Sequence, residues 1–169
     1  MKKRIIGFIL AISSVLCVGC NGNDTSYTIT FIQEGHAEIV KTVKSGESLA
    51  DIPLPQEKEG YDVAWDRENF DNVTSDLQVT AVLTPKNYTI TYTYDELLIN
   101  GGYTVVLEKQ SQTVSFNSEY ALATASCEGL SFLGWKNIET NEMVVSGTYT
   151  QAKDITLIAQ FEPEDQEWS

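Results

Sequence analysis

Few residues of the chain have the types and spacing that catalysis requires. The single histidine, His36, lies in a polar segment between Glu34 and Glu38, whereas a structural zinc site needs four donors. Cys127 would need a base such as His36 beside it to act as a nucleophile, and the two lie far apart in the sequence. We therefore expect His36 to be an exposed turn residue and Cys127 to be a small, partly buried thiol.

Two motif-like segments do not complete a site either. Residues 46–50, GESLA, resemble a nucleophile elbow but lack its final glycine and its strand-to-helix context. Residues 66–72 are rich in oxygen ligands, but an EF-hand loop starting there would need Gly at position 71 and Glu at position 77. Those positions hold Asp71 and Leu77. The sequence thus predicts no enzyme, no metal site and no cofactor.

The N-terminal residues indicate a covalent modification instead. A basic start at 2–4 precedes an apolar run over 5–16, which is shorter than the ~20 residues that span a bilayer. This pattern is typical of a secretory signal peptide. The residues up to Cys20 resemble the bacterial lipobox, and the resemblance implies cleavage before Cys20 and lipidation of its thiol. Two acyl chains there would anchor the protein stably. Cys17 is the alternative acceptor, but the leucine before it suits cleavage poorly.

Loss of the signal peptide changes the cysteine count and the charge. With Cys20 lipidated, Cys127 is left alone, so no intrachain disulfide is expected. The whole chain has 11 basic and 24 acidic residues, a net charge of −13. Without the three basic residues of the start, 8 basic and 24 acidic residues remain, a net charge of −16. So acidic a chain repels phosphate backbones, which excludes nucleic acid as a partner.

The rest of the chain contains an internal repeat. Residues 27–31, YTITF, return as YTITY at 88–92, with the alternation of β-branched and aromatic residues that favours a strand. Three more features recur in order: a strand and turn at Gly46 and Asn117, a glycine-led strand ending in Trp65 and Trp135, and an alternating strand near 77–82 and 155–161. We predict four strands per repeat and a mainly β fold, in which a small α+β character is allowed.

The two copies differ in their turns and in their length. Gly46 and Asn117 share a turn position, and both residue types tolerate a positive φ angle. The second copy has extra residues mainly in 95–112, where residues 100–102, NGG, predict a turn. Residues 103–107 are expected to extend a hairpin there.

This organisation divides the chain into five segments. They are a signal peptide at 1–19, a flexible tether at 20–26, a first repeat at 27–86, a second repeat at 87–161 and an acidic tail at 162–169. The link between the repeats is too short for independent tumbling.

Aromatic residues at matching positions predict the cores. A domain of this size buries only about 60% of the surface of its unfolded chain, so it depends on large side chains. We assign Trp65, Trp135, Tyr61 and Phe132 to the core. Three tyrosines lie outside the shared pattern and form a candidate binding surface: Tyr94, Tyr103 and Tyr149.

The ordered set of motifs resembles the internalin-B-type B repeat, also called the Listeria–Bacteroides repeat. The matching residues are Tyr27 to Phe31, Val43, Gly46, Pro53, Pro55, Gly60, Tyr61, Trp65 and Asp76-Leu77 in the first copy, and Tyr88 to Tyr92, Val114, Tyr120, Gly129, Phe132, Gly134, Trp135, Asp154 to Leu157 and Phe161 in the second. Ala64 departs from the pattern, which has glycine before the tryptophan.

The resemblance implies two tandem β-grasp-like repeats on the cell surface, used as an adhesive or spacer module. We therefore expect an exported protein that is lipid-anchored to the cell membrane, exposed outside the cytoplasm and able to bind an extracellular protein or glycan. The alternative is a non-catalytic structural spacer in the cell envelope.

Overall fold

The first repeat is a single four-stranded sheet in the computed structural model, which describes residues 25–164. Its strand order is β2-β1-β4-β3, with a parallel pair, β1 and β4, at the centre. The outer strands β2 and β3 pair antiparallel with them. The strands are β1 (Ser26–Ile32), β2 (Ile39–Lys44), β3 (Tyr61–Trp65) and β4 (Leu77–Pro85).

The second repeat has the same arrangement and extends it. Its strands run β7-β5-β13-β10, again with a central parallel pair, and β9 and β6 continue the sheet beyond β10. The strands are β5 (Asn87–Thr93), β6 (Val105–Leu107), β7 (Ser111–Ser115), β8 (Glu119–Tyr120), β9 (Ala125–Cys127), β10 (Leu130–Asn137), β11 (Met143–Val144), β12 (Gly147–Thr148) and β13 (Ile155–Pro163). The prediction of a mainly β fold with two tandem repeats is confirmed.

The extra residues of the second repeat form a short helix and a strand. Helix α1 (Glu96–Asn100) begins at Asp95, whose carboxylate accepts a hydrogen bond from the backbone N–H of Leu97 at 2.9 Å. The predicted turn follows it, and Gly102 has a φ angle of 88°. The predicted hairpin at 103–107 is wrong, because the helix redirects the chain and β6 pairs with the distant strand β9.

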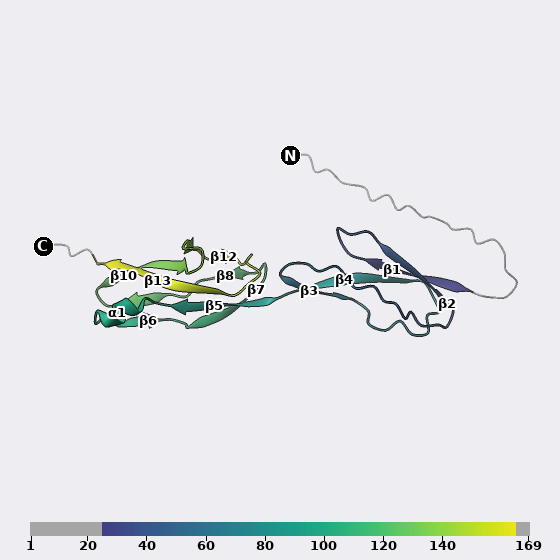
Figure 1. The fold of residues 1–169 in the computed structure, drawn as a ribbon, viewed down its shortest axis with the longest axis horizontal. Coiled ribbons are helices and arrows are strands. Elements are labelled where there is room, and N and C mark those ends of the chain that lie inside the picture. Colours follow the sequence, from purple (N-terminus) through teal and green to yellow (C-terminus); the bar gives the residue numbers. More distant parts are fainter. Residues whose placement is uncertain (1–24, 165–169) are drawn as a thin grey trace, which may run out of the picture.

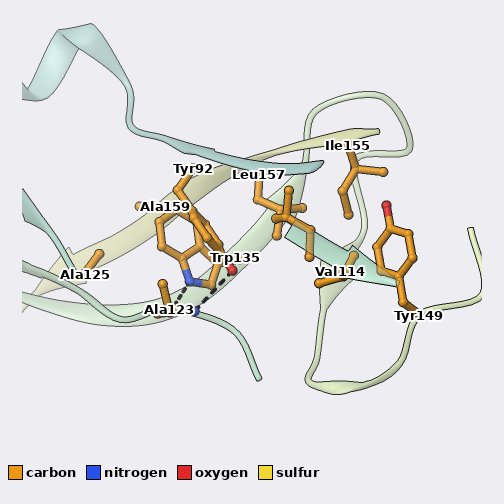
Figure 2. Packing of buried hydrophobic residues seen from close by; sticks show 10 residues of the cluster. Tyr92, Val114, Ala123, Ala125, Trp135, Tyr149, Ile155, Leu157 and Ala159 are labelled. Atoms are coloured by element: carbon orange, nitrogen blue, oxygen red, sulfur yellow. Dashed lines mark hydrogen bonds between the residues drawn. The ribbon is translucent and has the colours of Figure 1, made fainter. Parts of the chain in front are cut away.

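Each repeat has its own apolar core on one face of its sheet. The alternation of the first strand directs Ile29 and Phe31 inward, where they meet Phe70 and Val73 from the connection between β3 and β4. In the second repeat, the side chain of Trp135 from β10 lies among the buried residues of the core (Figure 2). Its buried companions are Ile90, Tyr92, Val114, Ala123, Ala125, Tyr149, Ile155, Leu157 and Ala159.

The two repeats differ by one residue in the strand that carries the tryptophan, β3 in the first repeat and β10 in the second. β10 pairs with β13 with a register shift between Phe132 and Gly134, so Leu133 is an extra, bulged residue. Gly134 has a φ angle of 131°, which favours glycine. β3 pairs with β4 without such a shift, from Tyr61 to Trp65. Ala64 is therefore accommodated where the family pattern has glycine.

The predicted turn conformations are confirmed. Gly46 and Asn117 have φ angles of 83° and 58°. The N–H of Gly46 donates to the carbonyl of Val73 at 2.8 Å, and the N–H of Asn117 donates to the carbonyl of Tyr149 at 2.7 Å. These bonds make Tyr149 the structural counterpart of Val73.

Candidate functional site

The joint between the repeats is a single residue. β4 ends at Pro85, β5 begins at Asn87, and only Lys86 lies between them. The N–H of Lys86 donates to the carbonyl of Gly60 at 2.9 Å, and its own carbonyl accepts a hydrogen bond from the N–H of Phe116 at 2.8 Å. The linking residue is thus bonded to both repeats, which lie end to end (Figure 1).

An aromatic contact covers this joint. The ring of Phe116, from the second repeat, lies edge-on to Tyr61 of the first, with the ring centroids 5.3 Å apart. It also contacts Tyr88, at 6.4 Å between centroids. A Cβ atom at Gly60 would come within 2.4 Å of the Phe116 ring. The assignment of Tyr61 to a core is corrected here, because its half-buried ring packs across the joint instead.

A polar groove of about 620 Å³ runs beside the joint. Its charged lining includes Lys58, Asp62 and Lys86, and the ammonium of Lys86 lies 3.5 Å from a carboxylate oxygen of Asp62. The ammonium of Lys58 lies 5.3 Å from the centre of the Tyr61 ring. With Glu57 and Glu59, the lining holds three acidic and two basic residues. These charges nearly cancel, so the groove carries no strong preference for an anion or a cation.

Tyr149 is not part of a binding surface. It is 2% exposed, and its hydroxyl donates to the carbonyl of Lys153 at 2.7 Å. Burial, followed by the nearby carboxylate of Asp154, raises its pKa to about 12. The repeat seen in the sequence rests here on the alternating strands near 77–82 and 155–161. Tyr149 precedes the second of these strands and was therefore left outside the shared pattern.

The extra residues 95–112 of the second repeat are called the insert below. The other two predicted surface tyrosines, Tyr94 and Tyr103, lie beside it and within it. Tyr94 packs against the core and lines a groove of about 540 Å³ with Ile99 of α1 and Leu107 of β6. Tyr103 is exposed. The structure therefore separates Tyr149 from the other two, and the insert carries exposed apolar side chains. These are Leu97, Ile99 and Val106.

The remaining core assignments divide by burial. Trp135 is fully buried, while Phe132 and Trp65 are half-buried and pack against the cores of their repeats. Cys127 is a buried free thiol in β9, and His36 is exposed in a turn. Among residues 25–164, no three acidic, histidine or cysteine side chains converge to hold a metal ion.

The predicted signal peptide and the lipidation site at Cys20 lie outside the described residues, as does the end of the predicted acidic tail. Its first residues, Glu162 and Pro163, belong to β13. Over the described part of the chain, no helix has the length and apolar character needed to cross a membrane.

Comparison with known proteins gives one family. No curated protein sequence matches the chain. The solved structure of Streptococcal High Identity Repeats in Tandem (SHIRT) domains 3-4 from a cell surface protein is similar at 15% identity and a TM-score of 0.28, over 82% of this chain and 99% of that chain. The family model of the Listeria-Bacteroides repeat domain matches residues 27–82 and 88–160. The chain therefore belongs to the Listeria-Bacteroides repeat domain family, with two repeats in tandem.

Proposed function

We propose that the protein is a lipid-anchored, non-catalytic spacer that holds its second repeat away from a membrane. Repeat domains of this type are extracellular or cell-surface modules. The spacer role was the alternative in the sequence analysis, and the joint now favours it over an adhesive role for the aromatic residues.

The single observation that carries this proposal is the hydrogen bonding of Lys86 to both repeats. A flexible linker needs several free residues to allow independent motion. Here one residue separates β4 from β5, and both its N–H and its carbonyl are engaged. Two repeats joined in this way behave as a short semi-rigid rod, as stacked repeats do.

The distance between the repeats tests this rigidity. Spin labels on Thr42→Cys and Glu128→Cys would report it, since both positions are exposed and lie in different repeats. The full chain would carry Cys17→Ser, Cys20→Ser and Cys127→Ala so that only these sites react. A single narrow distance distribution supports the spacer, and a broad distribution overturns it.

The membrane anchor is tested separately at Cys20. We propose that its thiol carries the lipid, because the residues before it resemble a lipobox. The variant Cys20→Ala should leave the membrane fraction after cell disruption, while Cys17→Ala should remain there as the matched control. Membrane retention of the Cys20→Ala protein would refute the anchor.

A second candidate function is adhesion through the insert of the second repeat. Leu97 is 72% exposed and Val106 is 58% exposed, both within the insert, and exposed apolar side chains are candidates for an interaction site. An adhesive insert would retain an extracellular protein or glycan from surface extracts, and Leu97→Glu with Val106→Glu would abolish retention.

The matched control for the insert is Val145→Glu. Val145 is 79% exposed and lies outside the insert, so the control introduces one glutamate elsewhere, against two in the insert variant. Adhesion would be contradicted if the insert variant and the control retained equal amounts of an extracellular protein or glycan. It would also be contradicted if the unsubstituted protein retained none.

A further inference from the structure

We infer that both repeats are built to resist tension along the chain, because the first and last strands of each repeat form a parallel pair. This inference rests on the proposed spacer function, which places the N-terminal tether and the second repeat at opposite ends of a stretched molecule. It adds a mechanical function to that of holding a distance.

The first repeat shows the geometry. β1 and β4 pair in parallel from Ile29 opposite Leu77 to Ile32 opposite Thr80. Since the strands run in the same direction, the start of β1 and the end of β4 lie at opposite ends of the ladder. Tension applied at these two points acts along the strands and across the hydrogen bonds between them. All bonds of the ladder are then loaded together and must break together.

The second repeat has the same geometry in series with the first. β5 and β13 pair in parallel from Ile90 opposite Ile155 to Thr93 opposite Ile158. Lys86 connects the end of β4 directly to the start of β5. Figure 1 shows the two strand pairs following one another along the long axis of the molecule. Tension entering at the tether and leaving at the end of β13 therefore crosses both ladders.

A carboxylate lengthens each ladder by one position. The carboxylate of Asp76, just before β4, accepts hydrogen bonds from the N–H and the hydroxyl of Thr28, at 2.7 and 3.0 Å. In the second repeat the carboxylate of Asp154, just before β13, accepts from the N–H of Thr89 at 2.8 Å. Hydrogen bonds to a charged acceptor are stronger than neutral ones. The same pair of strands is thus reinforced at the same end in both repeats.

The hairpin of β1 and β2 offers the opposite loading direction. These strands are antiparallel, and Ser26 lies opposite Lys44 at the open end of the hairpin. Tension applied to that end pulls β2 away from β1 and breaks their hydrogen bonds one after another. The same folded chain therefore contains a strong and a weak pulling direction.

Single-molecule pulling with optical tweezers compares the two directions. The full chain with Cys17→Ser, Cys20→Ser and Cys127→Ala would carry DNA handles on Thr25→Cys and Glu164→Cys, or on Thr25→Cys and Glu47→Cys. At equal pulling speed we expect several-fold higher unfolding forces for the first attachment. Equal forces, or a lower force for the first attachment, would overturn the inference.

The carboxylates provide a second test in the first attachment geometry. Asp76→Ala and Asp154→Ala should lower the unfolding force and raise the unfolding rate at zero force about tenfold, as the loss of one charge-assisted bond implies. Asp71→Ala, an exposed aspartate outside both ladders, should change neither. Unchanged forces in the Asp76 and Asp154 variants would overturn the reinforcing role of these carboxylates.

Failure of this inference and failure of the spacer proposal are distinguishable. A broad label distance between Thr42 and Glu128 with direction-dependent forces would refute the spacer alone. A narrow distance with equal forces in both directions would refute the mechanical function alone.

Discussion

Trp65 and Trp135 make the same hydrogen bond in the two repeats. The indole N–H of Trp65 donates to the carbonyl of Pro53, and that of Trp135 donates to the carbonyl of Ala123, both at 2.6 Å and both twelve residues earlier in the chain. Figure 2 shows the bond in the second repeat. Each tryptophan therefore ties to the sheet the segment that precedes its strand, between β2 and β3 in the first repeat and between β8 and β9 in the second.

Replacement of these tryptophans should affect the two repeats unequally. Trp135 is 1% exposed, so Trp135→Ala should lower the free energy of unfolding of the second repeat by about 3–5 kcal/mol. Trp65 is half-buried and packs on Phe31 at 5.0 Å between ring centroids, so Trp65→Ala should cost the first repeat less. Urea unfolding followed by circular dichroism measures both losses. A larger loss for Trp65→Ala than for Trp135→Ala would contradict the conclusion that the more buried tryptophan contributes more to stability.

Replacement of Gly60 tests the joint. Gly60→Ala would place a Cβ atom 2.4 Å from the Phe116 ring, which must move away. We expect the distance between labels at Thr42 and Glu128 to broaden, because the aromatic contact across the joint is lost. Pulsed electron resonance on the labelled chain measures this change.

Gly35 provides the matched control for Gly60. The φ angles of Gly35 and Gly60 are nearly the same, 81° and 80°. A Cβ atom at Gly35, however, would have no other atom within 4 Å. Gly35→Ala should therefore show the same backbone strain, about 1–2 kcal/mol, with an unchanged distance distribution. The same broadening in both variants would show that strain, not the contact, explains the effect.

The repeat and its turns were predictable because their signals are local. Alternation over 27–31 and 88–92 fixes which side chains face the core, and the glycine and asparagine at the shared turn adopt the positive φ angles that their types allow. The short link between the repeats was predictable, but the aromatic contact that covers the joint was not, because Phe116 gains its partner only when two finished repeats meet. Tyr149 was misplaced because its type does not match that of Val73, and only the hydrogen bonds from Gly46 and Asn117 show that the two positions are equivalent.

Alkaline pH should destabilise the second repeat. Burial raises the pKa of Tyr149 to about 12 from an ordinary value of 10.0, so between these values the unfolded chain loses a proton that the folded chain keeps. The stability contributed by the neutral phenol is complete below pH 10 and is lost as the pH rises toward 12. Urea midpoints across the alkaline range measure the slope.

Tyr149→Phe separates this effect from general alkaline unfolding. The variant should be less stable at neutral pH, by about 1 kcal/mol for the lost hydrogen bond to Lys153, and its stability should fall less steeply with rising pH. Burial also raises the pKa values of Tyr92 and Tyr120, so part of the slope remains. An unchanged slope would show that Tyr149 ionises equally in both states.

The bulge at Leu133 predicts losses of stability of different size at one aligned position. Gly134→Ala should destabilise the second repeat by about 1–3 kcal/mol, because a φ angle of 131° strains any residue with a side chain. Ala64→Gly, at the equivalent position of the first repeat, should cost only about 0.5–1 kcal/mol from backbone entropy. Thermal or urea unfolding compares the two variants.

Deletion of Leu133 should rescue Gly134→Ala. Without this exposed residue, the pairing of β10 with β13 matches that of β3 with β4, where Phe132 corresponds to Val63 and position 134 to Ala64. The register of the first repeat accepts alanine there without positive φ, so the double variant should regain most of the stability lost by Gly134→Ala. If the deletion instead adds to the loss, the bulge is needed for the packing of Phe132 and Trp135, whose centroids lie 5.4 Å apart, and the equivalence of the two strands fails.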